Sequence, residues 1–196
     1  MELLRGASLE EVCRRGPLGA DEVLEIGIEL CEALEALHAE GVIHRDLKPA
    51  NVIVLAEPEA GRRVKLLDLG VAKLMPAFYA EGEAVTPPEG RIQTQAGMPL
   101  GTPGYMAPEQ ARGEVDRQGP ATDVHALGGL LYEILEGRPP RQARTLEELL
   151  PRLNHLPPPP HGGALGALTL RCLAPEPQAR PKDAGELLAL VDRVMG

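Results

Sequence analysis

The sequence predicts a mainly α-helical domain of the α+β type, in which several helices pack around one small β-hairpin. Long segments repeat apolar residues at steps of three and four, which is the pattern of amphipathic helices. Only two short runs, 52–54 and 64–67, are rich in β-branched and apolar residues, and a polar connection joins them as in a hairpin. A chain of 196 residues is long enough for one domain with a sizeable core.

One extended segment and two helices are expected before the hairpin. Residues 1–8 are expected to be extended and to turn at Gly6, and residues 9–15 to form a short helix. The clearest helix is expected over 21–39, with Asp21 as its N-cap and Gly41 as the glycine that ends it. The predicted buried face of this helix consists of Val23, Gly27, Leu30, Leu34 and Leu37.

The second half of the chain is expected to contain a long irregular connection followed by helices. Residues 71–108 are rich in Pro, Gly and Thr, and a connection of this length in a compact domain usually has a function. Apolar helical patterns then return, interrupted by a stiff spacer at 157–160. Helices are expected over 121–135, 146–153, 163–173 and 183–195.

Composition and charge exclude several classes of function. The formal net charge is −9 and the isoelectric point is about 5.1, which argues against nucleic acid or an anionic membrane as the main partner. No apolar run approaches the roughly 20 residues that span a bilayer, and the N-terminus lacks the pattern of a signal peptide. The three cysteines are far apart and lack metal or redox spacing, which favours buried or free thiols in a reducing compartment. We therefore expect a cytoplasmic protein without a membrane segment.

The stretch with the most chemical content is the octet at 44–51, which reads HRDLKPAN. Its acid, its lysine and its asparagine have the spacing of the catalytic loop in phosphoryl transfer. The carboxylate of Asp46 can orient an attacking hydroxyl and accept its proton, and the ammonium of Lys48 can offset the charge of the phosphate under attack. The alternative is a solvated polar turn, which an isolated Asp and Asn at this spacing would usually be.

The predicted hairpin brings a second carboxylate next to this octet. Asn51 immediately precedes the first strand and Asp68 immediately follows the second, so pairing of the two strands places Asp68 beside Asn51. Carboxylate and amide oxygens are the ligands that Mg²⁺ takes in proteins, usually one or two together with several waters. The sequence therefore predicts a Mg²⁺ site at Asn51 and Asp68.

Three motifs together resemble the eukaryotic-type Ser/Thr protein kinases found in bacteria. They are the octet at 44–51, the triplet DLG at 68–70 and the segment GTPGYMAPE at 101–109. The resemblance covers essentially the whole chain and corresponds to the helical carboxyl-terminal lobe of the protein-kinase-like fold. It implies one catalytic domain over 1–196, with a hinge at 1–8, a catalytic loop at 44–51 and an activation segment at 68–109.

This resemblance implies a role for each residue of the motifs. Asp46 would be the catalytic base, Lys48 would contact the γ-phosphate and the substrate, and Asn51 and Asp68 would hold Mg²⁺. Thr102 would hydrogen-bond within the catalytic loop. Lys48 and the segment around Thr102 also point to Ser or Thr rather than Tyr as the substrate residue.

The resemblance further implies structural partners for the loop. Asp123 would brace the backbone at His44 and Arg45. Glu109 would form an ion pair with Arg180, and loss of one partner from a buried pair typically costs about 3–5 kcal/mol.

Arg45, next to the catalytic acid, implies a loop that needs a compensating anion. In kinases of this type the anion is a phosphothreonine of the activation segment. Thr94 is the first candidate and Thr86 the second, with an ordinary surface threonine as the alternative at either position.

The nucleotide side of the site is implied by the first residues, which resemble the hinge, with Met1 at the gatekeeper position. The backbone of Glu2 and Leu4 would face adenine, Ser8 would face the ribose, and Ile53 belongs to the same nucleotide-binding set. The Gly-rich loop, the strand Lys and the helix Glu of the family have no counterpart in these residues. We therefore expect the amino-terminal lobe and its sheet, which clamps the α- and β-phosphates, to be absent.

The sequence thus predicts a protein serine/threonine kinase domain that uses ATP and Mg²⁺ to phosphorylate a protein substrate. Because part of the nucleotide site belongs to an amino-terminal lobe that is missing or separate, we expect the chain alone to be weakly active or inactive. The alternative is a kinase-like scaffold without catalysis, which the absent lobe favours and the intact motif residues oppose. A small-molecule phosphotransferase of the aminoglycoside-kinase type would lack the 101–109 segment, and it ranks lower.

Overall fold

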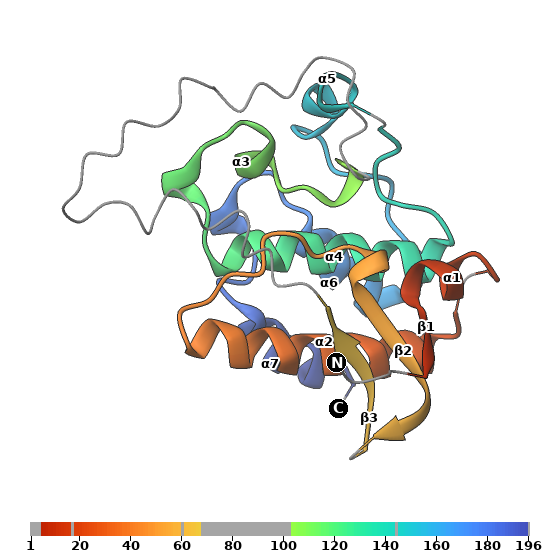
Figure 1. Ribbon diagram of the computed structural model, residues 1–196. Coiled ribbons are helices and arrows are strands. Elements are labelled where there is room, and N and C mark those ends of the chain that lie inside the picture. The colour runs from red at the N-terminus through yellow and green to blue at the C-terminus, as the bar shows by residue number, and fades with distance from the viewer. Residues whose placement is uncertain (1–4, 17, 60, 68–102, 144, 196) are drawn as a thin grey trace, which may run out of the picture.

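The computed structural model describes residues 5–16, 18–59, 61–67, 103–143 and 145–195, which form helices around a small antiparallel sheet (Figure 1). The strands are β1 (Gly6–Ser8), β2 (Val52–Glu59) and β3 (Arg62–Leu66). The α-helices are α1 (Leu9–Cys13), α2 (Ala20–Ala39), α3 (Pro108–Ala111), α4 (Pro120–Glu136), α5 (Leu146–Leu149), α6 (Gly163–Cys172) and α7 (Ala184–Met195). Short 3₁₀ turns are η1 (Pro49–Asn51), η3 (Pro103–Tyr105), η4 (Val115–Arg117), η5 (Leu150–Arg152) and η6 (Pro177–Ala179). The expected fold class is confirmed.

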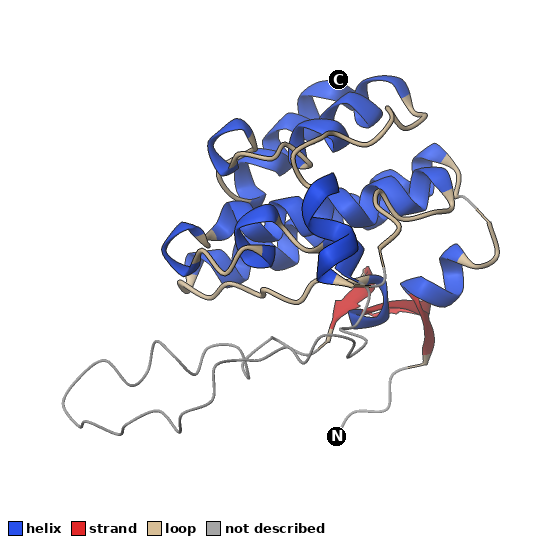
Figure 2. Ribbon diagram, turned by 90° about the horizontal axis from the view of Figure 1, so that it is seen from above, coloured by secondary structure: helices blue, strands red, loops and turns tan. Residues whose placement is uncertain are grey.

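Helix α4 lies at the centre of the helical part, packed against both α2 and α6. Two glycines allow this close approach. A Cβ at Gly27 of α2 would meet Leu131 Cδ2 at 3.1 Å, and a Cβ at Gly128 of α4 would meet the Cβ of Cys172 at 2.5 Å. Seen from above, the helices fill most of the described molecule and the strands lie together at one side (Figure 2).

Both ends of α2 follow simple capping rules, although one of them differs from the prediction. The helix begins at Ala20 with Gly19 as its N-cap, so the assignment of Asp21 to this position is wrong. Asp21 lies in the first turn, where a carboxylate interacts favourably with the helix dipole. At the other end Gly41 has a φ of 73°, and its amide donates to His38 O at 3.0 Å. The amide of Val42 donates to Leu37 O, which completes a Schellman motif and confirms the predicted stop.

The sheet contains the predicted hairpin and one further strand. Strands β2 and β3 pair antiparallel, and β1 pairs with β2 on its other side. The predicted turn at Gly6 is therefore wrong, because Gly6 lies in β1 opposite Leu55. A Cβ at Gly6 would meet Val54 O at 2.4 Å, so the missing side chain is what lets β1 lie against β2.

The three cysteines are buried and free, as the sequence predicts. Burial raises the pKa of the Cys13 thiol to about 12, and burial together with nearby glutamates raises that of Cys31 to about 12. Burial also raises the pKa of Cys172. Thiols of this kind behave as small core side chains rather than nucleophiles. Among the described helices, none is both long enough and apolar enough to cross a membrane.

The structure pairs Glu109 of α3 with Arg180, which follows η6, in a buried ion pair. Arg180 Nη1 and Nη2 donate to the two carboxylate oxygens of Glu109 at 2.8 and 2.9 Å, and both side chains are at most 1 % exposed. The other guanidinium hydrogens go to the carbonyls of Ala121, Ala174 and Pro175. Burial acts to raise the pKa of Glu109, but the Arg180 hydrogen bonds and charge outweigh it and lower that pKa.

Replacing Arg180 with Met should lower the free energy of unfolding by about 3–5 kcal/mol. The physical reason is that Glu109 would remain buried without its cation, and three backbone carbonyls would lose a donor. Equilibrium unfolding in urea, followed by circular dichroism, measures the change.

Arg117→Met is the matched control for this measurement. Arg117 also pairs with two carboxylates, those of Glu114 and Glu176, but its side chain is exposed to solvent. Water and salt screen surface pairs, so we expect little change in stability. Equal losses in the two variants would contradict the importance that we assign to burial.

Candidate functional site

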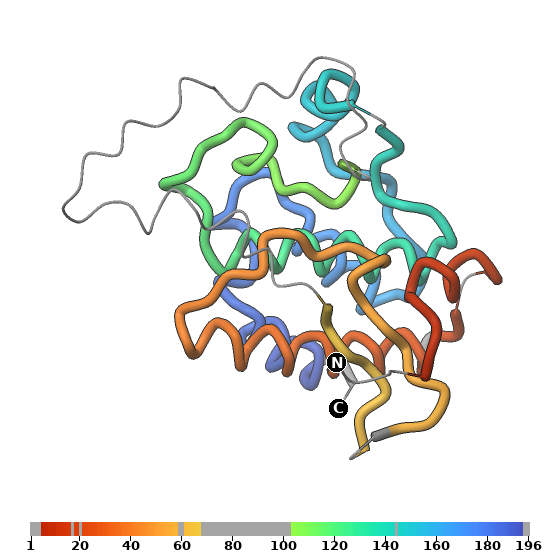
Figure 3. Tube along the Cα trace, viewed as in Figure 1, coloured from red at the N-terminus to blue at the C-terminus, as the bar shows by residue number. Residues whose placement is uncertain are grey.

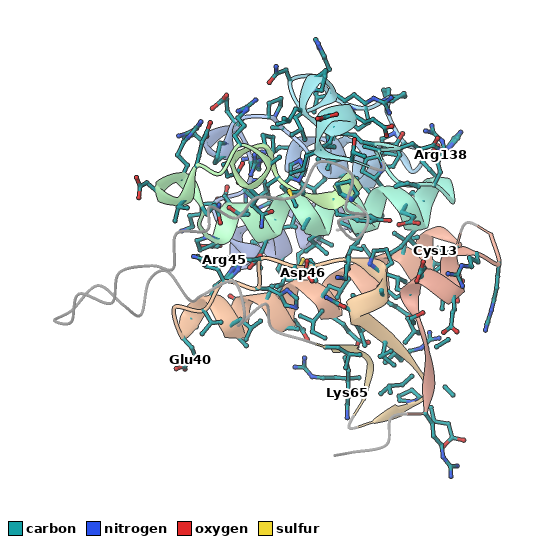
Figure 4. All side chains as sticks on the ribbon, turned by 45° about the horizontal axis from the view of Figure 1, so that its top comes forward. Cys13, Glu40, Arg45, Asp46, Lys65 and Arg138 are labelled. Atoms are coloured by element: carbon teal, nitrogen blue, oxygen red, sulfur yellow. The ribbon has the colours of Figure 1, made fainter. Side chains whose placement is uncertain are left out.

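The 44–51 loop returns from the end of α2 along α4 to the start of β2 (Figure 3). In Figure 4 its residues Arg45 and Asp46 lie between the ribbons of α2 and α4. The loop is thus held between the central helix of the fold and the first strand of the hairpin. Two residue types decide its position, namely a buried acid on α4 and a buried histidine in the loop itself.

The buried acid is Asp123, whose carboxylate accepts hydrogen bonds from two consecutive loop amides. The amide of His44 donates to Oδ2 and the amide of Arg45 donates to Oδ1, both at 2.8 Å. Asp123 is 1 % exposed, and His38 Nε2 of α2 lies 3.1 Å from its Oδ2. A buried carboxylate with several hydrogen-bond donors is a strong acceptor, so Asp123 fixes the start of the loop. This is the geometry that the family resemblance implies.

Arg45 has a φ of 63°, a left-handed backbone conformation that is costly for a residue with a side chain. Such a conformation persists only where surrounding bonds hold it. The amide of Arg45 is held by Asp123, and its carbonyl accepts a bond from Gln110 Nε2 at 2.9 Å. The backbone therefore turns sharply at Arg45, directly before Asp46.

Lys48 and Asn51 converge on Asp46. Lys48 Nζ donates to Asp46 Oδ2 at 2.9 Å. Asn51 Nδ2 donates to the backbone carbonyl of Asp46 at 2.9 Å and to its Oδ2 at 3.3 Å. The side chains of Asp46 and Lys48 are about one-third exposed, whereas Asn51 is buried. A carboxylate, an ammonium and an amide thus meet at a point that solvent and a ligand can reach.

The loop is also bonded to Leu67, the residue that follows β3 and directly precedes Asp68. The amide of Leu67 donates to Asn51 O at 2.8 Å. His44 is fully buried, its Nε2 lies 3.3 Å from Leu67 O, and the amide of Asp46 donates to its Nδ1 at 3.3 Å. The His44 side chain therefore connects Leu67, the residue before Asp68, to the backbone of Asp46. These contacts bring the end of the hairpin next to Asn51.

Besides Lys48 and Asn51, two more predicted nucleotide-binding residues lie in the described part of the chain. Ile53 lies on β2, half-buried, and pairs with Ser8 of β1, so both reach the part of the sheet next to Asn51. The Ser8 hydroxyl is engaged in a capping box, because it accepts from the Glu11 amide and donates to the Glu11 carboxylate. A ribose contact at Ser8, which stays a prediction, would compete with Glu11. The predictions outside the described residues concern Glu2, Leu4, Asp68, Thr86, Thr94 and Thr102.

Sequence reasoning missed two residues that contact the loop. His38 reaches Asp123 from α2, and Gln110 reaches the Arg45 carbonyl from α3. Each follows a residue that the sequence analysis had singled out: His38 follows Leu37 of the predicted buried face of α2, and Gln110 follows Glu109. No spacing rule connects them with residues that are 85 and 65 positions away.

Comparison with known proteins gives a consistent family. The model of the protein kinase domain matches residues 1–182. The chain is 38 % identical over 188 residues to serine/threonine-protein kinase Pkn1 of Myxococcus xanthus, a match that covers 92 % of this chain and 25 % of that protein. It is 36 % identical over 203 residues to serine/threonine-protein kinase PknB of Mycobacterium leprae, covering 99 % of this chain and 30 % of that protein.

A solved structure agrees with these sequence matches. The crystal structure of Rad53 1–466 in complex with AMP-PNP superimposes with a TM-score of 0.70 at 26 % identity, covering 96 % of this chain and 44 % of that chain. Serine/threonine-protein kinase A of Synechocystis is a further relative, 32 % identical, and this chain covers 37 % of its length. The chain thus spans about a quarter to under two-fifths of the length of these bacterial relatives.

Replacing Asp123 with Asn should loosen the 44–51 loop while the helices stay folded. Asn keeps one oxygen for one loop amide and turns an amide nitrogen toward the other, which then has no acceptor. Loss of a bond to a charged acceptor should lower the free energy of unfolding by about 1.5–3 kcal/mol. Urea unfolding measures this, and amide hydrogen exchange should increase at His44 and Arg45.

The control is Asp116→Asn on η4, where the carboxylate is exposed. We expect unchanged loop exchange in that variant. If Asp123→Asn left both stability and loop exchange at the wild-type level, the bracing role would be wrong.

Proposed function

The chain belongs to the protein kinase family, and we propose that it is a Ser/Thr protein kinase catalytic domain that transfers the γ-phosphoryl group of ATP to a protein substrate. One observation carries the proposal. Lys48 and Asn51 both bond to the carboxylate of Asp46, in a loop whose asparagine is bonded to the residue before Asp68. The relatives are named serine/threonine-protein kinases, which supports Ser or Thr as the residue modified.

In this proposal Asp46 orients the substrate hydroxyl and accepts its proton late in the transfer. The carboxylate is held in place through Oδ2 by Lys48 and Asn51, so its direction is set before substrate binds. Lys48 donates to Asp46 Oδ2 and its side chain is about one-third exposed, so in this proposal its ammonium turns toward a phosphate oxygen when ATP binds. An ammonium at that position would offset charge as the phosphoryl group moves.

Asn51 fits a role as a Mg²⁺ ligand. Its Nδ2 is committed to Asp46, so the amide oxygen is the atom left to face a cation. Asp68 would supply the second oxygen ligand, and the bond between Leu67 and Asn51 supports that placement. A bound Mg²⁺ would neutralise charge on the phosphates of ATP. The AMP-PNP complex of the Rad53 structure supports ATP as the nucleotide.

The remaining assignments are predictions of the same proposal. The hinge is placed at 1–8, the catalytic loop at 44–51 and the activation segment at 68–109. Thr102 is placed in contact with the catalytic loop, and Glu2, Leu4, Ser8 and Ile53 around the nucleotide. The partner is a protein substrate, with no role for nucleic acid, and a cytoplasmic location stays a prediction.

We further propose that residues 1–196 expressed alone transfer phosphate weakly or not at all. These residues contain no Gly-rich loop and no strand-borne Lys of the kinase pattern, which in the family cover the nucleotide. The remaining contacts would bind ATP only from one side. The competing hypothesis is a scaffold that keeps the helical fold without catalysis.

A fusion protein tests whether Asp46 serves in phosphoryl transfer, independently of the weak activity expected of residues 1–196 alone. A bacterial Ser/Thr kinase amino-terminal lobe is joined before residue 1, and phosphate transfer from radiolabelled ATP to a generic basic protein is measured. We expect transfer by the fusion and little by residues 1–196 alone. Asp46→Asn in the fusion should lower kcat by about 10²–10⁴-fold, because the base is lost while the shape is kept.

The control is Asp116→Asn in the same fusion, which should retain wild-type kcat because Asp116 is exposed on η4, outside the loop. Equal kcat with and without the Asp46 carboxylate would contradict its assigned role. A folded fusion without any transfer would favour the scaffold, and strong transfer by residues 1–196 alone would contradict their proposed weakness.

Phosphorylation of Thr94 is the second test, since Arg45 next to the base implies a compensating anion. Mass spectrometry of the active fusion after incubation with Mg²⁺-ATP should find phosphate at Thr94, with Thr86 as the next candidate. Thr94→Ala should lower kcat, and Thr145→Ala on the N-cap of α5 serves as a threonine control. Absence of phosphate at Thr94 together with unchanged kcat in Thr94→Ala would refute this assignment.

A further inference from the structure

Gln110, the third residue of α3, lies outside the 44–51 motif and bonds to the backbone of the catalytic loop. Its Nε2 donates to the Arg45 carbonyl at 2.9 Å. Its Oε1 accepts from the amide of Ala107 at 3.1 Å, which orients the side-chain amide. The donor of this amide thus faces the loop because its acceptor is already used.

The bond from Gln110 meets the loop at its most strained residue. Arg45 has a φ of 63°, and Asp123 Oδ1 accepts its amide hydrogen at 2.8 Å. Gln110 holds the carbonyl of the same residue. The backbone of Arg45 is therefore hydrogen-bonded to α4 through its amide and to α3 through its carbonyl. That carbonyl belongs to the peptide group between Arg45 and Asp46.

Helix α3 is short, but the residue beside Gln110 fixes it to the core. Glu109 forms the buried pair with Arg180 and also accepts from Thr122 Oγ1 at 2.9 Å. Thr122 is the neighbour of Asp123 on α4. The two helices that hydrogen-bond to Arg45, α3 and α4, are thus joined to each other by the buried carboxylate of Glu109. This connection restricts movement of the two groups that hold the Arg45 backbone.

We propose that Gln110 is a positioning residue for phosphoryl transfer, acting through the Arg45 carbonyl to set the direction of Asp46. This inference rests on the proposed kinase function. Gln110 does not touch the reacting atoms. Its bond restricts rotation of the peptide between Arg45 and Asp46, and so it narrows the range of positions that the carboxylate of Asp46 can take.

Two substitutions separate the two bonds of Gln110. Gln110→Met keeps the length of the side chain but loses both bonds. Gln110→Glu keeps an oxygen for the Ala107 amide, and it turns a carboxylate oxygen toward the Arg45 carbonyl instead of a donor. Gln142, an exposed glutamine, provides the matched controls Gln142→Met and Gln142→Glu.

The first measurement is amide hydrogen exchange in the 196-residue chain, which needs no catalysis. We expect exchange at Arg45 and Asp46 to increase about 3–10-fold in Gln110→Met, and at least about 10-fold in Gln110→Glu. Exchange in the core of α4 should stay at the wild-type rate, because Glu109 and Arg180 are untouched. Both Gln142 variants should match the wild type.

The second measurement is kinetic and uses the active fusion. We expect kcat to fall about 3–10-fold in Gln110→Met and further in Gln110→Glu, with the KM for ATP unchanged within about twofold. A residue that only stabilised α3 would change the midpoint of urea unfolding and would not separate kcat from KM.

The proposal is overturned if loop exchange in both Gln110 variants equals that of the wild type, or if exchange rises equally in α4 and the loop. Faster loop exchange with unchanged kcat would also refute the positioning role. If the wild-type fusion shows no transfer that depends on Asp46, the proposed function fails, and loop exchange still decides whether Gln110 holds the Arg45 peptide.

Discussion

The carboxylate of Asp123 receives the amide hydrogens of His44 and Arg45 while it is almost fully buried. A backbone that turns through a positive φ at Arg45 cannot satisfy these amides by regular secondary structure. The acceptor therefore has to come from elsewhere in the fold, and α4 provides it. The position of the loop backbone therefore depends on the position of α4. Gly27 and Gly128 allow α4 to pack closely against α2 on one side and α6 on the other.

A second buried carboxylate connects this brace to the rest of the molecule. Glu109 is bidentate to Arg180 and accepts from Thr122, the residue before Asp123. Because every guanidinium hydrogen of Arg180 finds an acceptor, the pair meets the condition under which buried charges are tolerated. The ends of α3 and α4 that face the loop are thus held in one hydrogen-bond and ion-pair network. The loop is rigid because it is bonded to these two helix ends.

Much of this organisation could be predicted because it is local in the chain. The helix over 21–39 was visible from apolar spacing, and the hairpin from two short runs with a polar connection. The hairpin prediction also placed the end of its second strand next to Asn51, and the bond from Leu67 to Asn51 agrees with it. Residues 1–8 were expected to be extended, but the pairing of β1 with β2 was missed, because three residues show no alternation and the pairing depends on the absence of a Cβ at Gly6. The N-cap of α2 was predicted at Asp21, but Gly19 takes that position although it makes no side-chain hydrogen bond.

The sequence by itself determined which chemical groups are present and which of them are close together, since Asp46, Lys48 and Asn51 lie within six positions of one another. It also determined the helical class, because apolar periodicity is a property of neighbouring residues. Only the tertiary structure decided which distant groups hold the loop. His38 meets Asp123 and Gln110 meets Arg45 across 85 and 65 positions, and such bonds depend on how the helices pack rather than on any local pattern. Hydrogen bonds require distances of about 3 Å and correct direction, which packing alone can supply.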